Sequence, residues 1–166
     1  MKTRKGFTLI ELIVVIAIIG VLAAILVPSM LGYVKKSKIS SANDAAASVQ
    51  KAFNTALIEL DEAGVSVQDG TYTHAHNAED INAGAITSDS QLGGKIMNYM
   101  DAGKKVQFNA EVKGGVCIAV AASPDQKYLG TYPAGVITVD NFGKANGYAK
   151  DDFDKALTAA VAKTSD

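Results

Sequence analysis

Residues 7–34 read FTLIELIVVIAIIGVLAAILVPSMLGYV, an apolar run that contains a single charged residue, Glu11. As a helix this run extends about 42 Å, enough to cross a hydrocarbon core of roughly 30 Å. An acidic side chain at the centre of a membrane span costs roughly 2.5 to 3.5 kcal/mol, so an acid in such a segment usually marks function. The run therefore predicts a membrane-spanning helix in which Glu11 needs a partner.

The beginning of this run and the residues before it, KGFTLIEL at 5–12, resemble the processing signature of type IV prepilins and of the related pseudopilins. In that family a membrane peptidase cuts after the glycine and methylates the new N-terminus. The resemblance implies cleavage between Gly6 and Phe7 and N-methylation of Phe7. It also implies that Glu11 neutralises the Phe7 amino group of an adjacent subunit during filament assembly. Within one chain that amino group would lie one turn from Glu11, because residues i and i+4 share a helix face.

The resemblance and the hydrophobic pattern together predict three parts. Residues 1–6 form a basic leader, 7–34 the membrane and filament-core helix, and 35–166 a globular domain. The expected fold class is α+β, the pilin fold, in which a long N-terminal helix packs against an antiparallel sheet of about four strands and a C-terminal helix follows. The first helix is expected to run from Thr8 to about Ala63, where Gly64 supplies a stop.

Pro28 lies inside this helix and is expected to disturb it. Proline lacks a backbone donor and clashes with the preceding turn, so a kink or local melting is predicted, helped by Gly20 and Gly32. The resemblance implies a use for it, since the equivalent segment is commonly unwound in the filaments of the family. A simple kink, which membrane helices tolerate, is the alternative.

After the long helix, a variable connection is expected at 65–103, with a short helix along Leu92, Ile96 and Met100 that starts at Asp89 or Ser90. A final amphipathic helix is expected at 150–163, and covering a sheet edge is its expected place. Alternating patterns and turn residues predict strands at 106–112, 116–121, 128–132 and 136–139.

Few residues suggest chemistry. Cys117 is the only cysteine, so no intrachain disulfide can form, and its apolar neighbours predict a buried structural thiol. His74 and His76 would share one face of a strand near Glu79 and Asp80, but solvated loop histidines are the preferred interpretation over a metal site. The sequence predicts no enzyme, no cofactor and no metal. A net charge of −1 gives no general affinity for nucleic acid.

Charges on the long helix are unevenly placed. Glu59, Asp61 and Glu62 crowd its C-terminal turns, where the helix dipole disfavours acids. The basic cluster at 35–38 lies about 24 residues earlier, some 36 Å along the axis, so a neighbouring copy displaced by that amount would bring the two together. A solvated charged face is the simpler interpretation and is preferred at this point.

The resemblance implies a structural subunit of a type IV pilus, a filament associated with adhesion and twitching motility. It implies as partners further copies of the chain, a prepilin peptidase, an assembly platform with a cytoplasmic ATPase, and membrane lipid before assembly. The flanking charges are balanced, so the resemblance alone implies an outward-facing C-terminal domain in the plasma membrane, followed by an extracellular pilus. The alternatives are a pseudopilin of a secretion or competence system, and a membrane-anchored extracytoplasmic binding domain.

Overall fold

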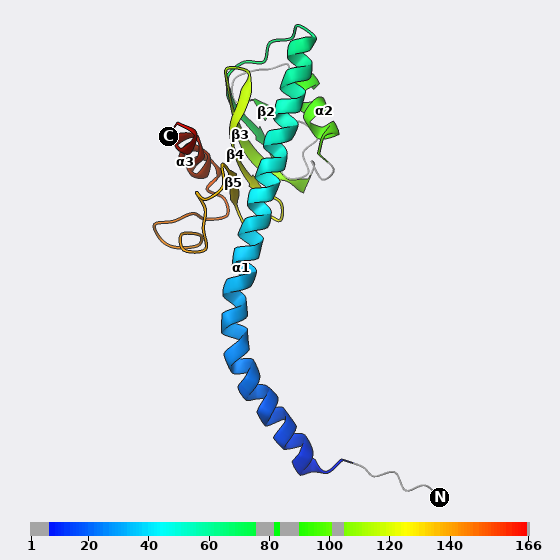
Figure 1. Ribbon diagram of the computed structural model, residues 1–166, viewed down its shortest axis with the longest axis vertical. Helices are drawn as coiled ribbons and strands as arrows, with labels where there is room; N and C mark the ends of the chain where they lie inside the picture. Colours follow the sequence, from blue (N-terminus) through cyan, green and yellow to red (C-terminus); the bar gives the residue numbers. More distant parts are fainter. Residues whose placement is uncertain (1–6, 76–81, 84–89, 101–104, 166) are drawn as a thin grey trace, which may run out of the picture. The chain divides into compact units, whose positions relative to one another are not determined.

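The computed structural model describes residues 7–75, 82–83, 90–100 and 105–165, and the chain divides into two compact units, residues 1–35 and 36–166. The α+β class is confirmed, with a long first helix, an antiparallel sheet and a C-terminal helix. In chain order the elements are α1 (Leu9–Glu62), β1 (Gly70–His74), β2 (Asn82–Ala83), α2 (Ser90–Asn98), β3 (Gln107–Lys113), β4 (Val116–Ser123), β5 (Gly130–Tyr132) and α3 (Phe153–Thr164) (Figure 1).

Helix α1 begins and ends where the sequence predicted. Its stop is a Schellman motif: the Val65 N–H donates to the Leu60 carbonyl at 2.8 Å and the Gly64 N–H to the Asp61 carbonyl at 2.9 Å. Gly64 has a φ of 73°, a left-handed conformation that glycine adopts without steric cost. Val65 then packs against the core that contains Leu60. The motif satisfies carbonyls that the helix end would otherwise leave without donors.

In the first unit, α1 is continuous through Pro28. The predicted local melting is therefore not present in the single chain. Pro28 cannot donate the usual hydrogen bond to the carbonyl four residues earlier, and the Ser29 hydroxyl donates to the Leu26 carbonyl at 2.9 Å. Every residue from 7 to 34 is exposed.

In the second unit, the sheet has five antiparallel strands in the order β2-β1-β3-β4-β5. The predicted strands at 106–112 and 116–121 correspond to β3 and β4, and the one at 128–132 is reduced to β5. Strand β1 lies within 65–103, the segment predicted as a variable connection, where the histidine spacing alone suggests a strand. The predicted strand at 136–139 is wrong: Asn141 accepts from the Thr138 N–H and donates to the Val136 carbonyl, both at 2.8 Å, so this backbone is satisfied by a loop.

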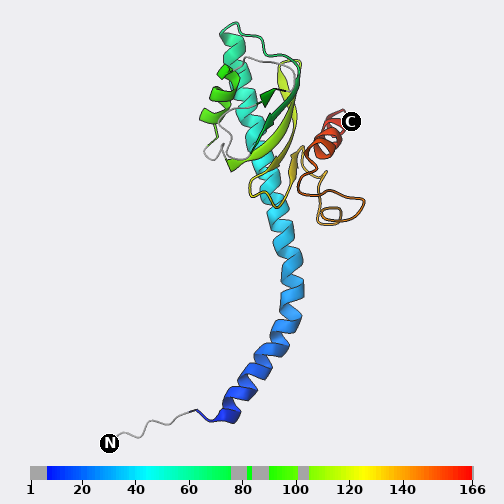
Figure 2. The ribbon, with the colours of Figure 1, turned by 180° about the vertical axis from the view of Figure 1, so that it is seen from behind.

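The two faces of the sheet are covered by different helices (Figure 2). Phe53 of α1 meets Tyr72 and Phe108 edge-on, with ring centroids 6.0 and 5.7 Å apart. Helix α3 packs over β3, β4 and β5. The expectation that this helix covers a sheet edge is wrong, because its buried side chains contact the second face. The residues of that layer are Ile39, Ala119, Ala121, Leu129, Ile137, Phe142, Phe153, Ala156, Leu157 and Ala160.

A β-bulge in β4 decides which layer Cys117 joins. The register of β4 shifts against β3 between Glu111 and Val112, and Ile118 is the extra residue. Cys117 therefore packs with the α1 layer, while Ala119 packs with the α3 layer. Strict alternation of period two would have placed both on one face.

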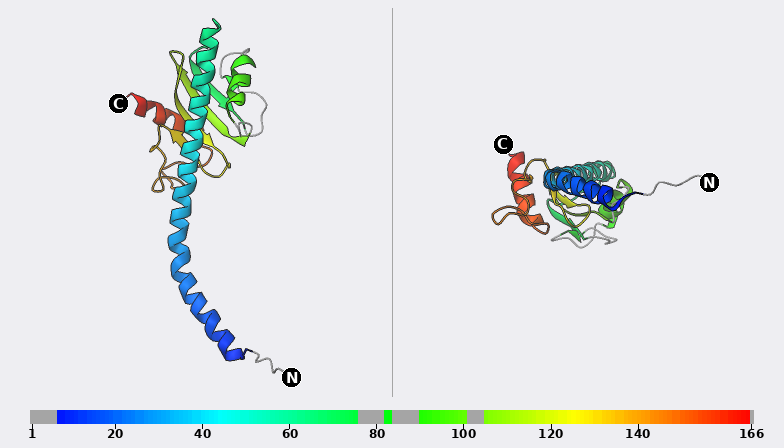
Figure 3. Two further views of the ribbon diagram at one scale, coloured as in Figure 1. Left: turned by 45° about the vertical axis from the view of Figure 1, so that its right-hand side comes forward. Right: turned by 90° about the horizontal axis from the view of Figure 1, so that it is seen from below.

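Helix α2 lies beside α1 (Figure 3), and its predicted side chains Leu92 and Ile96 are buried in the α1 layer. At the opposite sheet edge, the Thr131 N–H of β5 donates to the Asn43 side chain of α1 at 2.8 Å. Gly130 allows this approach, because a Cβ there would lie 2.2 Å from the Ala42 backbone. Helix α1 therefore supports the sheet across its width.

Candidate functional site

The exposed N-terminal part of α1 is the candidate site, and its first turn is organised by Thr8 and Glu11. The Thr8 N–H and hydroxyl donate to Glu11 Oε2 at 2.8 and 2.7 Å, and the Glu11 N–H lies 3.3 Å from the Thr8 hydroxyl oxygen. This is a capping box, in which the N-cap residue and the third helical residue satisfy each other's backbone donors. The pattern T-x-x-E at 8–11 predicts it, a signal that the sequence analysis missed. Glu11 therefore has a partner in its own chain.

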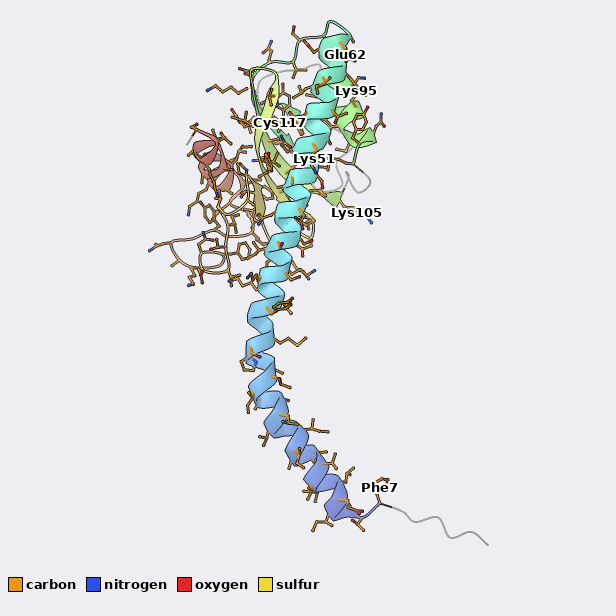
Figure 4. All side chains as sticks on the ribbon, in the orientation of Figure 1. Phe7, Lys51, Glu62, Lys95, Lys105 and Cys117 are labelled. Carbon is orange, nitrogen blue, oxygen red and sulfur yellow. The ribbon has the colours of Figure 1, made fainter. Side chains whose placement is uncertain are left out.

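The cap places the Glu11 carboxylate but leaves its charge uncompensated. Thr8 is neutral, and Glu11 is the only charged residue between 7 and 34. The positive end of the helix dipole favours an acid in this turn, but contributes only a fraction of a unit charge. Phe7, beside the start of α1 in Figure 4, is 93% exposed. The Thr8 N–H binds the carboxylate, and the backbone nitrogen of Phe7 is the one immediately before it in the chain.

The surface around this cap is apolar. Helix α1 is the one described helix with a stretch long and apolar enough to cross a membrane, and that stretch is exposed throughout. An apolar surface of this size marks a contact with lipid or protein. Its large exposed side chains are Phe7, Leu9, Ile10, Leu12, Ile13, Val14, Val15, Ile16, Ile18, Ile19, Val21, Leu22, Ile25, Leu26, Val27, Met30, Leu31, Tyr33 and Val34.

Cys117 is buried, as predicted, with 1% of its surface exposed. Burial raises the pKa of its thiol to about 12, while a contact with the Ala119 carbonyl acts weakly in the opposite direction. At neutral pH the group is therefore an unreactive thiol. It fills space between α1 and the sheet and is not a nucleophile.

The expectation of solvated histidines is wrong for His74. Its ring is 1% exposed, stacks on Phe108 with centroids 5.2 Å apart, and places Nδ1 2.8 Å from the Val106 carbonyl oxygen. Strand β1 turns this side chain into the core, which the interpretation as a loop histidine does not predict. His76, Glu79 and Asp80, the other candidates for a metal site, lie outside the described residues, as do Gly6 and the capping candidate Asp89.

The acids at the end of α1 do not share one environment. Glu59 accepts from Lys95 of α2 at 2.6 Å and from the Tyr99 hydroxyl. These contacts, Lys95 first, lower the pKa of Glu59, and the bond to Glu59 raises the pKa of Tyr99. The dipole penalty at Glu59 is thus offset inside the chain, which sequence reasoning did not anticipate. Asp61 and Glu62 instead line a surface groove.

Comparison with known proteins bears on the N-terminal part of this surface. A family model described as the prokaryotic N-terminal methylation motif matches residues 1–27, which include Gly6, Phe7 and Glu11. The type IV major fimbrial protein FimA of Dichelobacter nodosus is 43% identical over 61 residues, and the type IV major alpha-pilin of Moraxella bovis is 48% identical over 59 residues. The N-terminal region is thus similar to a methylation motif, and the chain is similar over about a third of its length to type IV pilins.

The similarity of this chain to these relatives is partial. The FimA match covers 37% of this chain and 39% of the relative, and the alpha-pilin match 36% and 37%. A second FimA sequence of D. nodosus is 30% identical over 99 residues, which cover 58% of this chain and 62% of that relative. The chain therefore spans less than two thirds of each of these proteins. No solved structure matches it significantly.

Proposed function

We propose that this chain is the structural subunit of a type IV pilus, held in the membrane by α1 before assembly and polymerised through the same helix afterwards. One observation carries the proposal: an exposed apolar helix long enough to span a bilayer begins with a capped acid whose charge no neighbour in 7–34 offsets. Lipid covers such a surface before assembly, and other copies of the helix cover it in a filament.

The processing steps belong to the same proposal. Cleavage after Gly6 makes Phe7 the N-terminus, and methylation keeps its amine cationic. The capping box then holds the Glu11 carboxylate on the N–H of Thr8, the residue next to that amine, and the exposed first turn leaves it open to an adjacent copy. Two opposite charges that are already in a low dielectric gain strongly from pairing, because each charge is costly there when it is left unpaired. A prepilin peptidase, an assembly platform and its ATPase are the partners that this route needs.

The matched relatives support a pilus over a pseudopilin, since their names describe major fimbrial proteins and a major pilin. The function is structural and not enzymatic. We place the globular domain outside the plasma membrane before assembly and on the pilus surface afterwards. The segment around Pro28, where one helical hydrogen bond is missing, is the place where α1 unwinds as the subunit leaves the membrane.

Mass spectrometry of the mature chain tests the processing. The expected N-terminus is N-methylated Phe7, and an intact or differently cut N-terminus contradicts the proposal. Electron microscopy of cells with and without this chain tests the function. Long surface fibres should disappear on deletion and return with the wild-type sequence, whereas unchanged fibres in deleted cells would sink the proposal.

Three variants separate the two roles of Glu11. Glu11→Gln keeps a side-chain acceptor for the Thr8 N–H but removes the charge, Thr8→Val keeps the charge but removes the hydroxyl of the cap, and Glu11→Ala removes both. If charge drives assembly, Glu11→Gln and Glu11→Ala should each lower the amount of filament about tenfold, which corresponds to about 1.4 kcal/mol per subunit. Thr8→Val should form filaments as the wild type does. Normal filaments from Glu11→Gln would leave only a capping role.

A further inference from the structure

A groove lies at the C-terminal end of α1, entirely within the second unit. It has a volume of about 480 Å³ and is formed by the last turns of α1, the chain after it and the β3–β4 turn. Leu57, Val65 and Val67 make an apolar floor, and Ile58 beside them is 61% exposed. Asp61 and Glu62 stand on its rim. We refer to these residues together as the acidic groove.

The charges of the acidic groove are not compensated by the part of the chain that the structure describes. Glu59, one turn earlier, is bound by Lys95 and Tyr99, but neither Asp61 nor Glu62 forms an ion pair with a described residue. Both carboxylates also lie at the helix end where the dipole disfavours negative charge. Figure 4 shows Glu62 at this end of α1. A cation from outside the chain would therefore be favoured there.

The complementary surface is on the same helix. Residues 31–36 carry the exposed side chains Leu31, Tyr33 and Val34, and then the exposed Lys36. Tyr33 and Lys36 are three residues apart and share a face. Lys36 forms no ion pair with any described residue. This segment thus offers apolar surface with a cation beside it, as the acidic groove offers apolar surface with anions beside it.

We propose that the acidic groove receives residues 31–36 of a second copy of the chain. The inference rests on the proposed filament and names one of its contacts. Lys36 and Asp61 cannot meet within one chain, because the helix between them extends about 38 Å. A second copy displaced along the axis by that length brings Lys36 to Asp61 and Glu62 while Tyr33 and Val34 cover Ile58. The contact sets an axial offset between copies that is separate from the pairing of Phe7 with Glu11.

The chemistry of the acidic groove disfavours other occupants. Two carboxylates on its rim repel anionic lipid headgroups and nucleic acid. A small-molecule site usually gathers several convergent polar groups in a mostly enclosed pocket, whereas these acids stand exposed on the rim. A basic segment with apolar neighbours fits both properties, and each copy supplies such a segment.

Charge reversal in cells tests the contact. Lys36→Glu should lower the ratio of sheared filament to processed membrane-bound chain roughly tenfold, because it places like charges opposite each other. Asp61→Lys with Glu62→Lys should do the same, and all three changes together should restore the ratio to within about twofold of the parent. Lys51→Glu is the matched control, since Lys51 is exposed on α1 between the two surfaces (Figure 4) and should change nothing. If the triple variant forms no more filament than the two charge-reversed variants from which it is combined, the contact is overturned.

Cross-linking supplies a readout that does not depend on how much filament forms. A chain with Lys36→Cys and Glu62→Cys, treated as filaments with a short bifunctional maleimide, should give a ladder of covalent oligomers, and either cysteine alone should give none. Cys117 does not interfere, because it is buried. If the double-cysteine variant forms filaments but gives no ladder, the contact is overturned. Normal filaments from both charge-reversed variants, Lys36→Glu and Asp61→Lys with Glu62→Lys, would also overturn it and would assign the groove to solvent or another protein. A parent chain that makes no filaments overturns the proposed function, and this inference with it.

Discussion

The Glu11 carboxylate accepts the hydrogen bonds of the N-terminal cap, and the proposed function gives it a second role in assembly. Two hydrogen bonds from Thr8 hold Oε2, so the side chain is ordered before any partner arrives. A preorganised charge loses less conformational entropy on binding than a free one. Two other residues are constrained by packing instead of charge. Burial at Cys117 and a close backbone approach at Gly130 leave little freedom to change the side chain.

Cys117 should resist thiol reagents in the folded chain. Because burial raises its pKa to about 12, the folded state holds the thiol proton more tightly than the unfolded state, whose thiol has a pKa near 8.5. The resulting stability is complete below the unfolded value and is lost as pH rises from about 9 towards 12. We expect no labelling by a maleimide at pH 8 until denaturant is added. Cys117→Ala should show a shallower alkaline loss of unfolding free energy, and an equal slope would contradict this assignment.

Gly130→Ala should destabilise the second unit. The added Cβ would lie 2.2 Å from the Ala42 backbone, so β5 must move away from α1 and disturb the Asn43–Thr131 bond. We expect a loss of about 2 kcal/mol or more in urea unfolding. Gly94→Ala is the control, since a Cβ there meets nothing within 4 Å, and it should gain roughly 0.5 to 1 kcal/mol as a helical substitution. Similar effects at the two positions would contradict the close approach.

Among the elements, α1 and α2 are joined by a buried apolar contact and by an ion pair at the surface. Leu92 and Ile96 bury the apolar side of α2 against α1. Lys95, on the outer side, reaches Glu59. A nine-residue helix is too short to be stable alone in water, so these contacts decide whether it forms.

Glu59→Gln should loosen α2 and remove part of the acid sensitivity of the chain. The pKa of Glu59 is lowered in the folded state, mainly by Lys95, so its contribution is present above the unfolded value near 4.5 and is lost as pH falls through the folded value. Hydrogen exchange of α2 amides should quicken in Glu59→Gln at neutral pH. Its unfolding free energy, measured in detergent from about pH 6 to about pH 3, should fall less than that of the parent. Glu62→Gln removes a nearby carboxylate without touching the Lys95 contact, so it is the control for hydrogen exchange and should not quicken exchange in α2.

At the scale of the whole molecule, the two units differ in how much apolar surface they leave exposed. Residues 7–34 bury nothing and need lipid or other copies, whereas every residue of the two core layers lies at Ile39 or beyond. The second unit therefore contains a complete core of its own, of ordinary size for one domain. We therefore expect the second unit to fold without the first, and the proposed function assigns assembly to the first unit.

A fragment of residues 36–166 should therefore be a folded monomer in water. We expect a cooperative thermal transition by circular dichroism and a monomeric mass in light scattering, without detergent. The full chain in the same buffer should aggregate, because its exposed apolar helix has no partner. A fragment without a cooperative transition would show that the first unit contributes to the core.

The sequence by itself determined the features that depend on near neighbours: the apolar helix with one acid, the stop at Gly64, the buried Cys117, and the helices at each end of the domain. These follow from periodicity and capping, which act over three to five residues. The tertiary structure decided the rest: strand β1 and the burial of His74, the loop in place of a strand at 136–139, α3 on the face of the sheet, and Lys95 beside Glu59. These depend on partners far apart in the chain, as Asn43 and Thr131 do across 88 residues. No local pattern specifies such pairs, because the side chains meet only after the layers have packed.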